Sequence, residues 1–193
     1  MTFNTILAKA TQDKIPSMTQ EGLFYCAHLI QSQHLTSILE IGTGHGVWAI
    51  TMALADPQVH ITTIELNPQR VIIARENIQA MGLSDRITVI HGDALTIPLD
   101  GLFDLILIDG PKGQNKVLFE KTIPHLNPSG HVLIDNLDFH GETSSNDPQS
   151  RDLKQLVRKI NAFKTWMSSQ SDFIVQSIDL GDGLLLVSRK YAR

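Results

Sequence analysis

Short apolar runs at regular intervals limit the folds open to this chain more than any other feature of its sequence. Each run is rich in isoleucine, leucine or valine and is bounded by glycine, proline, aspartate or asparagine; the runs are 37–41, 60–65, 87–91, 104–109 and 131–135. Because apolar residues fill each run instead of alternating with polar ones, we expect strands that are buried on both faces.

Helical patterns separate these expected strands. Helices are expected over 46–55, 67–81 and 113–126, with Pro68 in the first turn of the second helix and Gly82 at its C-terminal cap. Apolar residues at helical spacing indicate a later helix, namely Leu153, Leu156, Val157, Ile160 and Phe163. Strands that alternate with helices predict a parallel sheet covered on both faces.

Two more strands are expected at 173–178 and 184–189, joined by the turn-prone sequence Leu180-Gly181-Asp182-Gly183. This connection is too short for a crossover helix, so we expect an antiparallel hairpin. The predicted fold class is therefore α/β. Its sheet has seven strands and is mostly parallel, with an antiparallel strand from the C-terminal hairpin.

The composition is that of an ordinary globular protein, with 42% hydrophobic and 19% charged residues among 193. We expect a single domain over 1–193, with a helical cover segment at 1–35. No apolar run approaches the ~20 residues that span a bilayer, and the N-terminus lacks the pattern of a signal peptide. We therefore expect no membrane partner and a cytoplasmic location.

A glycine-rich turn, Gly42-Thr43-Gly44-His45-Gly46, follows the first strand and leads into a helix. Glycines let the backbone turn sharply and approach a ligand closely, which favours a nucleotide-like ligand, although such turns also occur without one. Glu65 ends the second strand roughly 20 residues later, where a carboxylate accepts hydrogen bonds from ribose hydroxyls. Asp93 follows the third strand and is placed to receive an adenine amino group.

The glycine spacing distinguishes between two nucleotide-like ligands. The third glycine of the dinucleotide fingerprint G-x-G-x-x-G would fall at Val47, so the fingerprint is incomplete. Glu40 adds a negative charge two residues before Gly42, which disfavours a pyrophosphate and suits a cationic amino-acid tail. Both observations favour S-adenosylmethionine over a dinucleotide.

The chain resembles the cation-dependent class I O-methyltransferases, which include catechol and caffeoyl-CoA O-methyltransferases and have a Rossmann-like sheet. The likeness runs from about residue 15 to 190, on the segments Met18-Thr19-Gln20-Glu21-Gly22, Leu39-Glu40-Ile41-Gly42-Thr43, Gly92-Asp93-Ala94, Asp104-Leu105-Ile106-Leu107-Ile108-Asp109-Gly110-Pro111-Lys112-Gly113-Gln114, Asp135-Asn136 and Gly181-Asp182-Gly183-Leu184. Within the family, the region after Asp135 is most similar to the bacterial tRNA 5-hydroxyuridine methyltransferases.

The resemblance implies roles for individual residues. It places Asp109, Asp135 and Asn136 on Mg²⁺ or another divalent cation, and Lys112 where catechol methyltransferases carry their catalytic lysine. Around the cofactor it places Met18, Glu65, Asp93, Ala94 and Asp109, together with Glu40 and the Gly42 turn. Relatives carry a serine where this chain has Trp48, so the Trp48 backbone takes over that cofactor contact.

The residues themselves are compatible with this chemistry. Carboxylate and amide oxygens are the ligands that Mg²⁺ prefers, and Asp109 and Asp135 end neighbouring expected strands. Aspartate and asparagine at strand ends are also common loop starters, so the residues alone leave the metal open. A metal would lower the pKa of a bound hydroxyl, and Lys112 would act as base or electrostatic partner.

Positive charge collects between residues 150 and 166, with five basic residues against one acid. Phosphate contacts dominate nucleic-acid affinity, so Arg151, Lys154 and Arg158 are candidates for RNA contact. We expect an O-methyltransferase acting on 5-hydroxyuridine at the tRNA wobble position. The alternatives are a catechol-like O-methyltransferase for small hydroxylated aromatics and a non-catalytic protein that binds S-adenosylmethionine or RNA. Relatives are often dimers, so a homodimer is expected.

Overall fold

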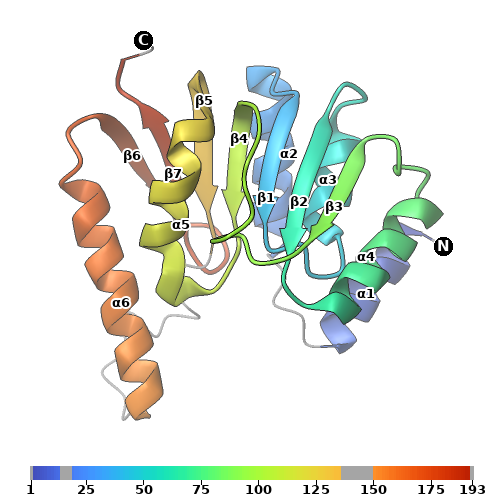
Figure 1. Cartoon of the computed structure of the whole chain (residues 1–193), viewed down its shortest axis with the longest axis horizontal. Helices are drawn as coiled ribbons and strands as arrows, with labels where there is room; N and C mark the ends of the chain where they lie inside the picture. The colour runs from blue at the N-terminus through green and yellow to red at the C-terminus, as the bar shows by residue number, and fades with distance from the viewer. Residues whose placement is uncertain (1, 14–18, 136–149, 192–193) are drawn as a thin grey trace.

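The computed structural model describes residues 2–13, 19–135 and 150–191. Seven strands in this part of the chain form one sheet in the order β3-β2-β1-β4-β5-β7-β6 (Figure 1). The strands are β1 Ser37–Ile41, β2 His60–Glu65, β3 Ile87–His91, β4 Phe103–Ile108, β5 Leu126–Ile134, β6 Phe173–Ile178 and β7 Leu184–Arg189. The predicted fold class is confirmed, because β1 to β5 are parallel and β7 runs antiparallel to both β5 and β6.

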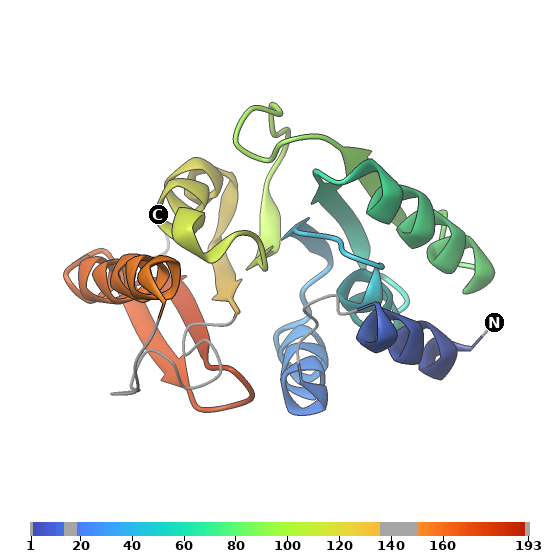
Figure 2. The same cartoon turned by 90° about the horizontal axis from the view of Figure 1, so that it is seen from below.

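Helices cover both faces of this sheet. They are α1 Phe3–Gln12, α2 Gln20–Gln33, α3 Val47–Ala55, α4 Pro68–Ala80, α5 Asn115–Thr122 and α6 Arg151–Ser168, with 3-10 turns η1 Lys112–Gln114 and η2 Ile123–His125. None of the helices described is long and apolar enough to cross a membrane. Figure 2 shows α6 beside the β6–β7 hairpin and α1 beside α4 at the opposite end of the molecule.

Two apolar clusters hold the layers together. One joins α1, α2, α3 and α4 to one sheet face through residues such as Ile30, Ile50 and Leu105. The other joins α5 and α6 to the opposite face through residues such as Phe119 and Ile160. Adjacent strand residues belong to opposite clusters, which explains why the strand runs are apolar throughout.

Two element boundaries differ from the prediction. The helix expected over 113–126 is α-helical only from Asn115 to Thr122, because Pro124 lacks the backbone N–H that an α-helix requires and occupies η2. The fifth strand begins at Leu126 instead of residue 131, and a register shift between Phe103 and Leu105 lets the extra length pair with β4.

The strand register brings the chemistry-bearing residues to one edge of the sheet. Ile41 pairs with both Ile64 and Ile108, and Ile108 also pairs with Ile134. The residues that follow these four positions therefore meet at the carboxyl edge, which is where open α/β sheets bind their ligands.

The basic helix α6 has the amphipathic form expected of it. Ile160, Phe163 and Met167 are buried, whereas Arg151, Lys154 and Arg158 are exposed. The exposure leaves these three side chains accessible, and their contact with RNA remains a prediction.

Candidate active site

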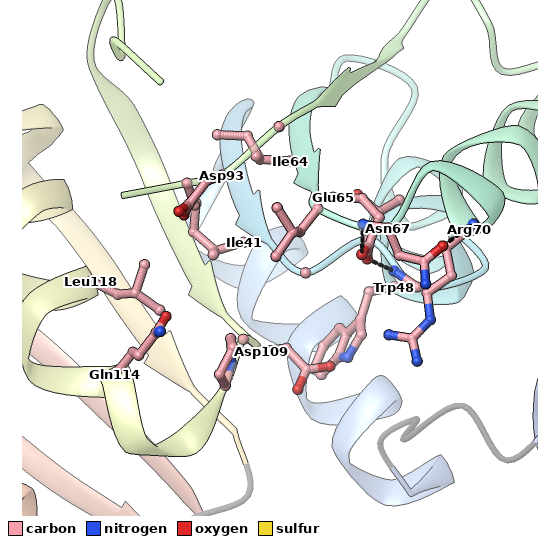
Figure 3. A pocket seen from close by; sticks show the side chains of 18 of the residues that line it. Ile41, Trp48, Ile64, Glu65, Asn67, Arg70, Asp93, Asp109, Gln114 and Leu118 are labelled. Carbon is pink, nitrogen blue, oxygen red and sulfur yellow. Dashed lines mark hydrogen bonds between the residues drawn. The ribbon is translucent and has the colours of Figure 1, made fainter. Parts of the chain in front are cut away.

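A pocket of about 530 Å³ opens at the carboxyl edge of the sheet. Its lining includes seven residues that the sequence singled out, namely Gly42, Trp48, Glu65, Asp93, Ala94, Asp109 and Lys112 (Figure 3). The predicted residues Met18 and Asn136 lie outside the described part of the chain. The pocket therefore gathers most of the predicted cofactor residues around one cavity.

The glycine turn passes very close to the end of β4. Gly42 has φ +99°, and a Cβ atom built there would lie 2.4 Å from the carbonyl oxygen of Asp109. Gly46 has φ +82° and begins α3 without any side-chain cap. Only glycine satisfies both the backbone conformation and the close approach at position 42, so the turn fixes the spacing between β1 and Asp109.

Glu65 is held in place by the backbone on either side of it. Its Oε2 accepts a hydrogen bond from the Gly44 N–H at 2.9 Å, and its Oε1 accepts one from the Asn67 N–H at 2.8 Å. Within the described part of the chain each carboxylate oxygen accepts from one donor, which leaves each with a lone pair for a ligand. A carboxylate fixed in this way is pre-oriented for two ligand hydroxyls.

Asp93 stands at the opposite wall of the same cavity. Its Oδ1 accepts the Leu95 N–H at 2.9 Å, which fixes the carboxylate against the turn after β3. Figure 3 shows Asp93 across the cavity from Glu65, with Gln114 and Leu118 on the adjoining wall. This arrangement leaves a space between two carboxylates, lined on one side by apolar residues such as Leu118.

Asp109 and Lys112 form an ion pair at the floor of the pocket. Lys112 Nζ donates to Asp109 Oδ1 at 2.8 Å, and both side chains are about nine-tenths buried. Burial raises the pKa of the Asp109 carboxyl, and the adjacent Lys112 ammonium opposes that rise. The pair places a carboxylate and an ammonium group side by side at the cavity.

Asp135 lies on the neighbouring strand end. It is buried, and its backbone N–H donates to the Ile108 carbonyl at 3.2 Å, which brings it next to Asp109 in register. Among residues 2–13, 19–135 and 150–191, no group of three or more His, Cys, Asp or Glu side chains is placed to hold a metal. Two aspartates that follow neighbouring strands are compatible with an oxygen-ligated divalent cation. Asp135 is absent from the described pocket lining, and the third expected ligand, Asn136, lies outside the described residues.

Glu40 lies in the core behind the glycine turn. The side chain is completely buried, it accepts a hydrogen bond from Thr63 Oγ1, and it is absent from the described pocket lining. Burial raises the pKa of the Glu40 carboxyl well above its usual range, because low-dielectric surroundings disfavour the charged form. The cofactor contact expected of Glu40 stays a prediction.

Several lining residues were not anticipated from the sequence. His45 is buried within the glycine turn, where its carbonyl accepts a hydrogen bond from Asn77 Nδ2 at 2.9 Å. Arg70 and Gln114 also line the cavity. The position of Gln114, two residues after Lys112, was the one available signal, because the same turn carries both.

The fold and the pocket define a Rossmann-like methyltransferase. Residues 3–190 match the family described as O-methyltransferase, and the chain belongs to that family. A catechol O-methyltransferase from Mycobacterium tuberculosis is 35% identical over 130 residues, which are 64% of this chain and 58% of that protein. The match thus spans less than two thirds of that relative.

Solved structures agree with the family. A Staphylococcus aureus protein proposed to be a caffeoyl-CoA O-methyltransferase has a TM-score of 0.93 at 28% identity, over 98% of this chain and 92% of its own. A Bacillus cereus O-methyltransferase in complex with SAH has a TM-score of 0.82 at 25% identity, over 97% and 90% of the two chains. These relatives support the predicted family, but not the finer likeness to tRNA 5-hydroxyuridine methyltransferases.

Proposed function

We propose that the protein is an S-adenosylmethionine-dependent O-methyltransferase that methylates a hydroxyl group of a small aromatic compound with the help of a divalent cation. The observation that carries the proposal is the buried Asp109–Lys112 pair at the floor of the pocket. The M. tuberculosis catechol O-methyltransferase and the SAH complex of the B. cereus enzyme support the substrate class and the cofactor.

Different residues of the pocket bind different parts of S-adenosylmethionine. Glu65 accepts the ribose hydroxyls, and Asp93 accepts the adenine amino group across the cavity. S-adenosylmethionine supplies an activated methyl group bound to sulfur. Direct displacement needs the acceptor oxygen, the methyl carbon and the sulfur in line, so a rigid glycine turn under the ligand contributes through alignment.

Lys112 handles the proton of the acceptor hydroxyl. A divalent cation held by Asp109, Asp135 and Asn136 would lower the pKa of that hydroxyl when bound. As a neutral amine Lys112 takes that proton and becomes an ammonium, and as an ammonium it stabilises the oxygen anion that remains. The burial of Lys112 next to Asp109 keeps water away from the ammonium, which strengthens its interactions with Asp109 and with the substrate oxygen.

The test is methyl transfer with three acceptors assayed side by side: catechol, a hydroxylated aromatic acid and an anticodon stem-loop carrying 5-hydroxyuridine. Each acceptor is assayed with Mg²⁺ and with EDTA. We expect transfer to the small aromatics with Mg²⁺ and its loss with EDTA. Transfer to the stem-loop alone would instead support the tRNA reading, which the exposed basic face of α6 favours.

A lysine pair separates catalysis from folding. Lys112→Met should lower kcat by about 10²–10⁴-fold, the usual contribution of a positioned acid or base, while S-adenosylhomocysteine still binds. Lys116→Met is the matched control, because Lys116 is exposed on α5 and lies outside the pocket lining; its ammonium is 3.7 Å from Glu120 and 4.8 Å from the centre of the Trp166 ring. Retained cofactor binding without transfer to any acceptor, in the unaltered protein, would favour a non-catalytic binding protein.

A further inference from the structure

Trp48 is the pocket residue to which the proposed function gives no side-chain role. It lies in the first turn of α3, it is only 3% exposed, and its indole lines the cavity. Relatives are expected to carry a small serine here, so this chain replaces a hydroxyl with a large ring. The ring therefore occupies part of the pocket wall.

The indole N–H is a buried donor that has not found its acceptor. Trp48 Nε1 is inaccessible to solvent and has no hydrogen-bond partner of ordinary geometry among the described residues. A buried donor left in this state is costly, so such groups generally serve an acceptor that moves or arrives. Hydrogen bonds at active sites are often long before the substrate binds and tighten afterwards.

The Asp109 carboxylate is a candidate acceptor. Figure 3 shows the Trp48 indole nitrogen facing this carboxylate from the side of α3. Burial raises the pKa of the Asp109 carboxyl, and the indole N–H of Trp48, like Lys112, acts in the opposite direction. Lys112 approaches the same group and occupies Oδ1 at 2.8 Å.

We propose that Trp48 is a positioning residue whose indole N–H donates to the Asp109 carboxylate and holds it in place when Lys112 turns toward the substrate hydroxyl. The inference rests on the proposed function, in which Lys112 acts on the substrate hydroxyl, and it adds that Lys112 leaves Asp109 to do so. Without a second donor, a carboxylate that loses its ammonium partner rotates freely about its terminal bond. The indole prevents that rotation, so the carboxylate stays aligned with Asp135.

A single indole resonance provides a direct test that needs no activity. The chain contains two tryptophans, Trp48 and Trp166. In Trp166→Phe protein, the one ¹⁵N-indole signal reports on Trp48. We expect Lys112→Met to move this signal downfield, because the carboxylate then relies on the indole. In the Lys112→Met protein, Asp109→Ala should move the signal back upfield, as for loss of a hydrogen bond. A signal unchanged by Asp109→Ala overturns the proposal.

Removal of the N–H group alone tests the function of the contact. β-(3-Benzothienyl)alanine replaces the N–H with sulfur and preserves the shape of the ring, so it is introduced at position 48 in the Trp166→Phe background. The readouts are Mn²⁺ affinity, S-adenosylhomocysteine affinity, kcat and KM. Loss of groups that orient a metal ligand weakens metal binding by about 10–100-fold. We expect a loss in that range for Mn²⁺ and about a tenfold fall in kcat, with S-adenosylhomocysteine affinity within twofold.

The other outcomes separate this proposal from the proposed function. Weaker S-adenosylhomocysteine binding with unchanged Mn²⁺ affinity would assign the N–H to the cofactor and overturn the positioning role. If the parent protein neither binds Mn²⁺ nor transfers methyl groups, the proposed function fails, and the indole signal still decides whether Trp48 holds Asp109. Trp48→Phe, which also loses the N–H, should reproduce the direction of each change.

Discussion

Replacing Gly42 by alanine tests how closely the glycine turn and the catalytic floor depend on each other. The new Cβ would lie 2.4 Å from the Asp109 carbonyl oxygen and 2.9 Å from its carbonyl carbon, both backbone atoms that cannot swing aside. A left-handed backbone costs an L-residue about 1–2 kcal/mol, and overpacking a tight site costs about 1–3 kcal/mol more. We therefore expect Gly42→Ala to lower the free energy of unfolding by about 2–5 kcal/mol.

Gly82 supplies the matched control for this substitution. It also has a positive φ, +69°, but a Cβ atom there would meet nothing within 4 Å. Gly82→Ala should therefore cost only the backbone strain of about 1–2 kcal/mol and leave S-adenosylhomocysteine affinity unchanged. Urea unfolding measures the stability difference, and calorimetry measures cofactor affinity. Equal stability losses in the two variants, or full cofactor affinity in Gly42→Ala, would refute the reasoning from the close approach.

Three further substitutions test the site and its support. Glu65→Gln should weaken S-adenosylhomocysteine binding about 10–100-fold, since hydrogen bonds to a charged group contribute about 1.5–3 kcal/mol. Glu76→Gln is the control and should leave binding unchanged, because Glu76 is exposed. Equal calorimetric affinities of the two variants would argue against a ribose site. Asp104→Asn should destabilise the fold at pH 7, because hydrogen bonds lower the pKa of the folded Asp104 carboxyl despite its burial. This stabilisation is lost only in acid, so the difference in urea-measured stability from the unaltered protein should shrink as the pH falls below about 4. A pH-independent difference would contradict this. Arg86→Met should lower stability by about 2 kcal/mol, because its Nη1 donates to the carbonyls of Ala53 and Asp56 at 2.7 and 3.0 Å; an unchanged urea midpoint would count against that role.

The sequence was most informative where the local backbone conformation favours one residue type, such as glycine at a positive φ or proline at a helix start. Gly42 and Gly82 mark positive-φ positions, and Pro68 marks a helix start, so the turn and α4 were predictable within a residue or two. The strands β1, β2 and β3 were predictable because burial on both faces demands continuous apolar runs. The helix expected over 113–126 was predicted too long, because Pro124 ends the α-helix in the 3-10 turn η2. Its start was also misplaced, because η1 lies against α6, a contact between distant segments that local pattern does not encode.

Side-chain direction was the part that sequence could not supply. Glu40 and Glu65 are both acids near strand ends, yet one lies in the core and the other in the pocket. The difference comes from depth along the strands, because Glu40 pairs with Thr63, two residues before Glu65, and the two acids therefore share a sheet face. Glu65 ends β2 at the carboxyl edge, where the pocket opens, whereas Glu40 lies one step further inside, under the helices.

The position of Asp109 just after β4 explains why both Lys112 and the Trp48 indole can approach its carboxylate. Asp109 follows the last residue of β4, so its side chain leaves the sheet at the carboxyl edge, where α3 begins on one side and η1 on the other. Gly42 allows the turn that leads into α3 to approach Asp109, and η1 carries Lys112. A substitution that widens the glycine turn should therefore disturb Trp48 and Lys112 together, since both reach Asp109 only while the ends of β1 and β4 remain in contact.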